Sequence, residues 1–348
     1  MFFFKNQILS EIAAIILLPL TLIYHFTVKI RYLLFKRGYI KRYIPEIYTI
    51  SVGNITVGGT GKTPLVIDLV KEFSKKGYSP AVITRGYGRK SSSRIEVTKD
   101  TPVNTSGDEA AEIFKKTGCT VICDKDRSSA ISYINGQNDI VILDDAFQHL
   151  RVSAHLNIVM IDERRFFGNK LLLPSGILRD RISRLRSADV IVLSKVRDFH
   201  SPETKQKILK LKKYCKNILI SAIRVSNFTQ KGKEFSLKHF ENKKIGLFCG
   251  IGSPDDFFAL FEGMDIVKKL PLPDHYRYTE PERILEAFEG KCDVLITTYK
   301  DFVKLTTDVV SRNNIFCLET NNIYYNVSFE EKTLCEHLKP LLPVKDHK

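Results

Sequence analysis

GNITVGGTGKT (residues 53–63) is a glycine-rich loop that joins a strand-like run to a helical one, and this arrangement is the main indication of the fold. EIYTISV (46–52) precedes it, and PLVIDLVKEFSKKG (64–77) follows it with helical spacing. Strand, glycine loop and helix in this order are typical of a phosphate-binding loop, whose backbone N–H groups, lysine and hydroxyl bind nucleotide phosphates and Mg²⁺. The sequence therefore predicts a nucleotide site.

Each residue of the loop has an expected part in this site. Lys62 can reach the β- and γ-phosphate oxygens, and the Thr63 hydroxyl can bind Mg²⁺. Thr56 stands five residues before Gly61, where the strict motif has a glycine, so the loop is a variant. The residues predicted to contact the nucleotide are Thr56, Val57, Gly58, Gly59, Thr60, Gly61, Lys62 and Thr63.

A second acidic strand supports this interpretation. DIVILDD (139–145) is an apolar run that ends in Asp144 and Asp145. A carboxylate at the end of such a strand lies beside the Mg²⁺ of a phosphate-binding loop. We therefore predict that Asp144 binds the metal and that Asp145 takes part in catalysis.

Further buried-looking strands alternate with helical stretches, which predicts a mostly parallel sheet with helices on both faces. These strands are AVITR (81–85), TVIC (120–123), LNIVMID (156–162) and DVIVLS (189–194). DVLITT (293–298) and NIFCLET (314–320) continue the alternation in a smaller carboxy-terminal α/β lobe. The expected divisions are an apolar and basic segment (1–45), a nucleotide-binding domain (46–225), a polar linker (226–242) and the second lobe (243–348).

Composition narrows the class of protein. The chain has 348 residues, of which 43% are apolar and 27% charged, and this mixture excludes disorder, collagen and a long coiled coil. The seven cysteines form no CxxC pair and no Cys/His ligand spacing, so they are expected to be reduced core residues.

The formal charge of +15 is concentrated in two segments, with a net of +5 in residues 1–47 and +9 in residues 197–244. Local clusters of this kind predict a surface that faces one anionic partner, either membrane lipid or a phosphorylated substrate. They do not indicate nucleic acid, because the lysines lack interleaved aromatic residues. Part of the second cluster, SPETKQKILKLKKYCK (201–216), is also compatible with a helix whose lysine face is simply solvated.

The amino terminus carries a membrane-seeking run, ILSEIAAIILLPLTLIY (8–24), followed by six basic residues. It is too short and interrupted for a typical transmembrane helix, which needs about 20 apolar residues. We predict an interfacial helix whose apolar face enters one leaflet while the basic flank meets anionic headgroups. The alternative is a helix packed on the protein's own core.

Eight stretches together resemble one family, the tetraacyldisaccharide 4'-kinases of lipid A biosynthesis. They occur in family order and are SVGNITVGGTGKTP (51–64), TRGYGRK (84–90), SGDEA (106–110), DDAFQHLRV (144–152), LLLPSGILRD (171–180), FCGIGSPDDFF (248–258), LPDHY (272–276) and TTYKDFVKL (297–305).

The resemblance implies transfer of the ATP γ-phosphate to the 4'-hydroxyl of a tetraacylated glucosamine disaccharide 1-phosphate. It implies ATP and Mg²⁺, a peripheral location on the cytoplasmic face of the bacterial inner membrane, and no protein partner. A lipid acceptor with an anionic phosphate would account for both the apolar terminus and the nearby positive charge.

The resemblance also assigns residues. It implies that Asp108 is a catalytic aspartate and that His275 is its partner histidine, and such a pair can share proton removal from the acceptor hydroxyl. It places Gln148 and His149 near the nucleotide and Asp180 near the metal. Two of these motifs depart from the family pattern: Ala146 replaces a glycine and Asp180 replaces a glutamate.

Two other functions stay open at this stage. One is a membrane-attached ATPase or GTPase switch, although the chain lacks the Asn-Lys-x-Asp guanine-reading motif in LSKVRD (193–198) and TTYKD (297–301). The other is a kinase for a different small substrate, for which the apolar terminus would have no purpose.

Overall fold

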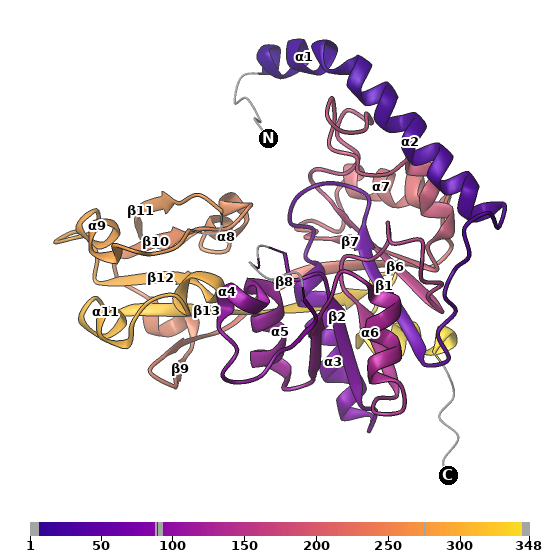
Figure 1. Ribbon diagram of the computed structural model, residues 1–348. Coiled ribbons are helices and arrows are strands. Elements are labelled where there is room, and N and C mark those ends of the chain that lie inside the picture. Colours follow the sequence, from indigo (N-terminus) through magenta and orange to yellow (C-terminus); the bar gives the residue numbers. More distant parts are fainter. Residues whose placement is uncertain (1–6, 88, 90–92, 275, 343–348) are drawn as a thin grey trace. The chain divides into compact units, whose positions relative to one another are not determined.

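The computed structural model describes residues 7–87, 89, 93–274 and 276–342. Its contacts divide the chain into two compact units: residues 1–222 with 323–348, and residues 223–322. The strands β8 (Ile218–Gln230) and β13 (Ile315–Tyr325) carry the chain from one unit into the other. Figure 1 shows the elements in chain order.

The first unit is built on a mostly parallel sheet in the order β8-β7-β6-β1-β5-β2-β4-β3, in which only β3 runs antiparallel to its neighbour. Its other strands are β1 (Tyr48–Asn54), β2 (Pro80–Thr84), β3 (Ile95–Glu96), β4 (Thr120–Cys123), β5 (Ile140–Leu143), β6 (Leu156–Asp162), β7 (Val190–Ser194) and β14 (Glu331–Lys332). Its helices are α1 (Gln7–Ile16), α2 (Leu18–Lys36), α3 (Lys62–Lys75), α4 (Val103–Ser106), α5 (Asp108–Thr117), α6 (Arg127–Ile134), α7 (Pro202–Lys212) and α12 (Leu334–Leu338), with short 3₁₀ turns at Ile182–Ser187 and Lys339–Leu341.

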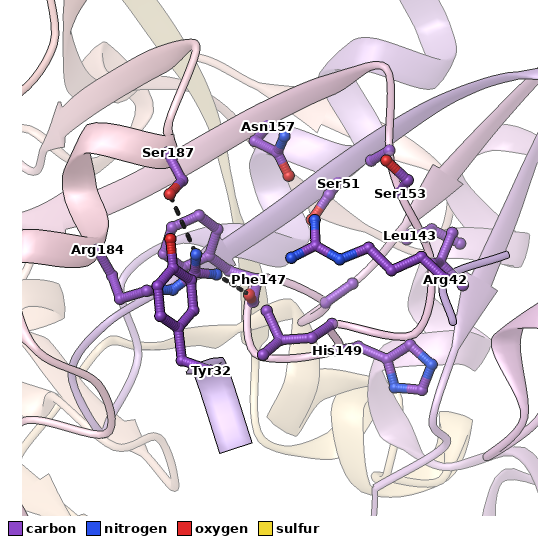
Figure 2. Close-up of a pocket in the computed structure, with 14 residues that line it drawn as sticks. Tyr32, Arg42, Ser51, Leu143, Phe147, His149, Ser153, Asn157, Arg184 and Ser187 are labelled. Carbon is purple, nitrogen blue, oxygen red and sulfur yellow. Dashed lines mark hydrogen bonds between the residues drawn. The ribbon is translucent and has the colours of Figure 1, made fainter. Parts of the chain in front are cut away.

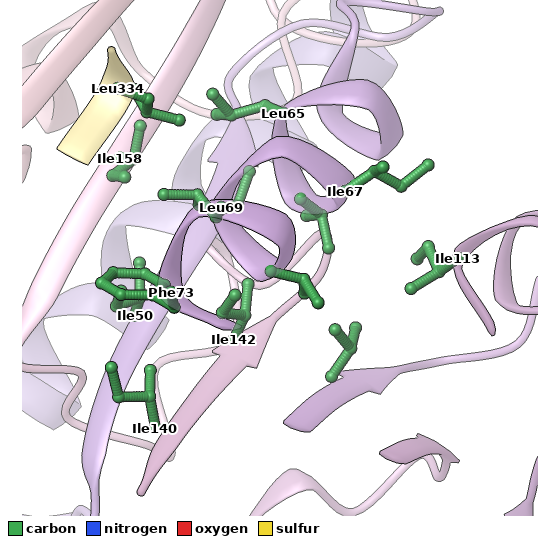
Figure 3. Close-up of a cluster of buried hydrophobic side chains, with 14 of the residues drawn as sticks. Ile50, Leu65, Ile67, Leu69, Phe73, Ile113, Ile140, Ile142, Ile158 and Leu334 are labelled. Carbon is green, nitrogen blue, oxygen red and sulfur yellow. The ribbon is translucent and has the colours of Figure 1, made fainter. Parts of the chain in front are cut away.

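Along β5, alternate side chains pack into two different hydrophobic cores. Ile140 and Ile142 of β5 pack with α3, α5 and α12, whereas Val141 and Leu143 pack with α6. This alternation follows from the two-residue period of a strand. Figure 3 shows Leu65, Leu69 and Phe73 of α3 directed at the first of these cores. The predicted parallel sheet with helices on both faces is therefore confirmed.

The second unit contains the parallel strand order β11-β10-β12-β13, and β9 pairs with β8 in antiparallel fashion. Its own strands are β9 (Lys233–Phe235), β10 (Ile245–Cys249), β11 (Ile266–Pro271) and β12 (Val294–Thr298). Its helices are α8 (Pro254–Ala259), α9 (Pro281–Glu286), α10 (Tyr299–Phe302) and α11 (Thr307–Arg312), with a 3₁₀ turn at Leu237–Phe240. Residues 226–242, expected to form a linker, are instead the end of β8, β9 and this turn.

Residues 323–342, expected in the second lobe, pack with the first unit. Tyr324 donates a hydrogen bond to Asp68 of α3 (2.6 Å), and Glu72 of α3 accepts the backbone N–H groups of Leu334 (3.0 Å) and Cys335 (2.6 Å). These contacts cap α12, because the first N–H groups of a helix have no partner within it. The division observed in the structure therefore differs from the predicted one in where the last residues belong.

The predicted amino-terminal helix forms as two helices that break at Leu17. Pro19 lies in the first turn of α2, where its missing N–H is tolerated. α2 continues past the apolar run to Lys36 and so includes much of the basic stretch. It is held through Thr21, whose hydroxyl donates to Ser175 (2.7 Å), and through Tyr24, whose hydroxyl donates to the Arg179 carbonyl (2.8 Å).

Candidate active site

The glycine loop lies at the carboxyl end of β1 and leads directly into α3. Gly58 and Gly61 have φ values of +98° and +85°, which glycine adopts without a steric penalty. Gly53 is required by close packing, because a Cβ there would lie 2.6 Å from the Cβ of Phe147. The loop therefore presents its backbone at the start of a helix, where N–H groups and the helix dipole favour an anion.

Neighbouring segments hold the backbone of the loop in this shape. Val57 donates its N–H to the Ile177 carbonyl (2.8 Å), and Arg179 donates its N–H to the Ile55 carbonyl (2.7 Å). Thr56, the departure from the strict motif, is buried in an antiparallel bridge to Leu178. Threonine at this position is thus part of the support of the loop.

Two residues at the end of β7 bind the same loop from another side. Lys195 donates to the Gly59 carbonyl (2.6 Å) and also pairs with Asp162 (3.1 Å). Ser194 donates its hydroxyl to the Thr60 carbonyl (2.8 Å). Burial lowers the pKa of Lys195, against the attraction of Asp162. Lys195 was not predicted as a site residue, although its position directly after an apolar strand could have indicated one.

Lys62 is held by a carboxylate beside the loop. Its ammonium lies 3.5 Å from Asp145, and the Arg179 guanidinium binds both oxygens of the same carboxylate at 3.0 and 3.2 Å. Burial alone would raise the pKa of Asp145, but Lys62 and Arg179 outweigh it and hold that pKa below its usual range. Arg179 also donates to the Asn54 side chain (3.2 Å) and was not predicted as a site residue.

Asp145 adopts the left-handed backbone conformation, with φ +47°. Ala146, which stands where the family pattern has a glycine, does not have a positive φ itself, because the positive φ falls on the preceding aspartate. Aspartate tolerates this conformation better than most residues, because its short polar side chain can bond locally.

The carboxyl group of Asp144 has different surroundings from that of Asp145. It is buried, its Oδ2 accepts a hydrogen bond from Thr84 (3.3 Å), and its Oδ1 has no hydrogen-bond partner among the described residues. Burial, followed by the charge of Glu109, raises the pKa of Asp144 to about 7 despite the opposing attraction of Lys62.

Asp108 begins α5 and is half-buried. The electrostatic effect of Glu109 on Asp144 indicates that the amino terminus of α5 lies near the carboxyl end of β5. Asp108 is therefore in the same helix turn as the acid whose charge acts on Asp144. Glu109 was not predicted as a site residue, although it is the adjacent acid in SGDEA.

A divalent cation fits this group of oxygens. The unpaired Oδ1 of Asp144 and the high pKa of its carboxyl are what an acid shows when it lacks a countercharge. Thr63 is in the first turn of α3, where its hydroxyl was expected to bind Mg²⁺. Within the described ranges, no group of three His, Cys, Asp or Glu is placed to hold a metal ion. Mg²⁺ commonly uses one or two protein oxygens and completes its shell with phosphates and water.

The remaining predicted residues have other surroundings. Gln148 donates its amide to the Asn54 carbonyl (2.6 Å), so it supports the base of the loop. Asp180 pairs with Arg184 (3.3 Å) and accepts the Arg181 N–H (2.8 Å). These contacts favour a structural role for Asp180 over the metal-binding role predicted for it.

His149 lines a cavity together with Phe147, and its Nε2 has no partner in the described part of the chain. Burial and the neighbouring arginines lower its pKa to about 4. No contact of this ring with the loop is recorded, so its predicted place at the nucleotide stays a prediction. His275 lies outside the described residues.

Comparison with known proteins gives a consistent result. A model of the family described as "Tetraacyldisaccharide-1-P 4'-kinase" matches residues 13–342. The tetraacyldisaccharide 4'-kinase of Francisella tularensis subsp. novicida is 36% identical over 278 residues, covering 76% of this chain and 82% of its own. That of Methylobacillus flagellatus is 32% identical over 295 residues, covering 83% of each chain.

A solved structure is also similar over nearly the whole chain. It is LpxK from Aquifex aeolicus, described as an apo form in complex with ATP. The two structures superpose with a TM-score of 0.73 at 25% sequence identity, covering 94% of this chain and 98% of the other.

Proposed function

Because the chain belongs to the tetraacyldisaccharide 4'-kinase family, we propose that it transfers the γ-phosphate of ATP to the 4'-hydroxyl of a tetraacylated glucosamine disaccharide 1-phosphate. This step forms the 4'-phosphate of lipid A in lipopolysaccharide biosynthesis, with lipid IVA as its product. The observation that carries the proposal is the glycine loop with Lys62 held at 3.5 Å from Asp145, beside Asp144, whose Oδ1 has no hydrogen-bond partner among the described residues.

Phosphoryl transfer needs positioning and charge neutralisation more than covalent chemistry by the protein. The loop amides and Lys62 supply fixed positive charge where the phosphates bind. Asp145 holds Lys62 in place, and Arg179 holds Asp145 through two hydrogen bonds from a planar guanidinium. This chain of contacts fixes the lysine before the nucleotide arrives.

Magnesium would be held by Asp144 and the Thr63 hydroxyl, and when bound it neutralises the charge on the transferring phosphate. Asp144 then serves as a ligand in its ionised form. Its high pKa in the metal-free protein gives the site a reason to take up a cation, because a nearby positive charge restores the ionised carboxylate.

Asp108 is the proposed base for the acceptor hydroxyl, with His275 as its partner. The position of Asp108 in the first turn of α5, next to Glu109, supports this assignment. The amino terminus of a helix favours a carboxylate, so α5 supports a negatively charged side chain at this position.

We further propose that α1 and α2 dock the enzyme on the cytoplasmic face of the inner membrane. In the part of the chain that the structure describes, no helix has the length and apolarity needed to cross a bilayer. Yet ten large apolar side chains between Ile12 and Leu34 are exposed, from 37% at Leu34 to 71% at Ile15. An exposed apolar stripe with a basic flank suits an interfacial helix and a lipid acceptor.

The direct test is incubation with radiolabelled ATP, Mg²⁺ and the disaccharide 1-phosphate in mixed micelles, followed by chromatography of the lipid. We expect label in the lipid, and none when Lys62 is replaced by alanine. Label found in free phosphate but never in lipid would replace the proposal with an ATPase switch.

A further inference from the structure

A polar cavity of about 120 Å³ lies beneath α2 and is lined in part by Phe147, the residue that packs against Gly53 of the loop. Its walls come from α2, the segment after it, β1, residues 143–157 and the 3₁₀ turn at Ile182–Ser187. Figure 2 shows Arg42 directing its guanidinium into the cavity, with Ser51 and His149 also on its wall. The proposed transfer reaction does not use any of these three side chains.

Two buried groups in this wall lack partners. Ser51 is 3% exposed, and its hydroxyl has no hydrogen-bond partner among the described residues. The same is true of the buried Nε2 of His149. A buried polar group without a partner is costly, and such groups are normally satisfied. A ligand in the cavity could supply the hydrogen bond that such a group on its wall lacks.

The charge of the wall is positive. Arg42 has no carboxylate partner within the described ranges, and its recorded contact is with the Phe35 ring. Neither aspartate nor glutamate is among the lining residues. The Arg184 guanidinium is already used by Asp180, Ser187 and the Phe147 carbonyl. The net charge available to a ligand is therefore that of Arg42.

The surroundings of His149 point the same way. After burial, the causes that hold its pKa low are the charges of Arg127 and Arg31, with a smaller effect of Arg151, while Asp126 opposes them. The positive charges of these arginines therefore act on the part of the wall that His149 forms. An anion in the cavity would be attracted by them, and the neutral imidazole could donate a hydrogen bond to it.

The Arg42 cavity has a neighbouring cavity under the same helix. The two share Tyr32, Leu150 and Arg184, and the second is also lined by Gln148 and Arg179. Arg179 is the residue that binds Asp145. Tyr32 of α2 therefore lines both the cavity that holds Arg42 and the cavity that holds the partner of Asp145.

We propose that the Arg42 cavity binds a phosphate monoester, and that the acceptor's own 1-phosphate supplies it. A monoester carries about −1.5 to −2 charges at pH 7 and offers acceptor oxygens to the guanidinium and to the hydroxyl. This inference rests on the proposed function, because it assumes the phosphorylated disaccharide as acceptor. It reassigns Arg42 from the membrane-facing basic flank to the recognition of the substrate.

The test compares two acceptors, the disaccharide 1-phosphate and its 1-hydroxyl counterpart, in uncharged detergent micelles. Arg42→Met keeps an apolar stem against Phe35 but removes the charge. We expect it to raise KM for the phosphorylated acceptor roughly 10- to 100-fold, as the loss of a charged hydrogen bond does. KM for ATP and KM for the 1-hydroxyl acceptor should stay at wild-type values. Ser51→Ala should raise the same KM by a smaller factor without lowering the thermal midpoint.

The matched control is Lys41→Met, which removes the same charge from the adjacent exposed residue. Equal effects of the two variants, or an Arg42→Met effect shared by both acceptors, would overturn the subsite. An effect that appears only after anionic phospholipid is added, and then for both acceptors, would assign the bound phosphate to a membrane headgroup and overturn the substrate assignment. If wild-type enzyme labels neither acceptor, the proposed function itself fails; if it labels the phosphorylated one and Arg42→Met matches it, only the subsite fails.

Discussion

Replacing Asp144 by asparagine should stabilise the metal-free protein at pH 8 while abolishing phosphoryl transfer. The carboxyl of Asp144 has its pKa raised from 3.8 to about 7 by burial and by Glu109. Its contribution to stability is favourable below pH 3.8 and is lost as the pH rises to about 7, because the folded protein binds the proton more tightly than the unfolded chain.

The size of the effect follows from this difference. At 1.36 kcal/mol for each tenfold change in proton affinity, ionised Asp144 costs the folded state roughly 4 kcal/mol at pH 8. At pH 5 the cost is roughly 1.5 kcal/mol, since only the unfolded chain is then ionised. Asparagine does not ionise and can still accept the Thr84 hydrogen bond, so it should recover much of this energy.

Asp145→Asn is the matched control, because the pKa of that neighbouring carboxyl is lowered by Lys62 and Arg179. It should destabilise the protein at pH 8. Urea unfolding of both variants and the wild type, without Mg²⁺ or nucleotide at pH 5 and pH 8, measures the two effects. The reasoning is refuted if Asp144→Asn lowers the free energy of unfolding at pH 8, or if its gain there is no larger than at pH 5.

Three further experiments test other parts of the molecule. Lys62→Ala and Asp108→Ala should each cut phosphorylation of the acceptor by orders of magnitude while circular dichroism stays native; a variant with wild-type rates would leave the mechanism. Ile23→Glu should move the protein from the membrane to the soluble fraction, whereas Leu209→Glu, at a site of similar exposure, should not; equal fractionation of the two would contradict docking through α2. Glu72→Gln should lower the free energy of unfolding by about 1–3 kcal/mol, measured in urea, because it weakens charged hydrogen bonds to the first turn of α12; an unchanged midpoint would show that the cap is dispensable.

Much of the first unit could be predicted from local sequence. The strands β1, β4 and β6 begin and end within two residues of the apolar runs that indicated them, because buried parallel strands are continuous apolar segments between turn signals. The sequence also predicted the loop and its helix, because the glycine-rich segment ends where the helical period begins. Asp145 lies 3.5 Å from Lys62 of the loop, at the end of the strand that the apolar run indicated, while the catalytic and metal-binding roles of Asp145 and Asp144 stay predictions.

Other features depend on contacts that sequence spacing does not encode. Arg179 and Lys195 bind the loop from segments more than 100 residues away, so neither position indicates its partner. The return of residues 323–342 to the first unit depends on Glu72 and Asp68, which read as ordinary surface acids of α3. The polar composition of residues 226–242 predicts a linker, but a polar segment can still form an edge hairpin such as β8–β9.

The double passage of the chain through β8 and β13 makes the second unit an insertion rather than an appendage. A fragment that stops near residue 225 would lose α12 and leave Leu65, Leu69 and Phe73 without part of their cover. A shortened protein meant to retain the nucleotide loop should instead splice Ala222 to Ile323 through a brief turn. A fusion or domain exchange made with this chain would have to respect the same two junctions.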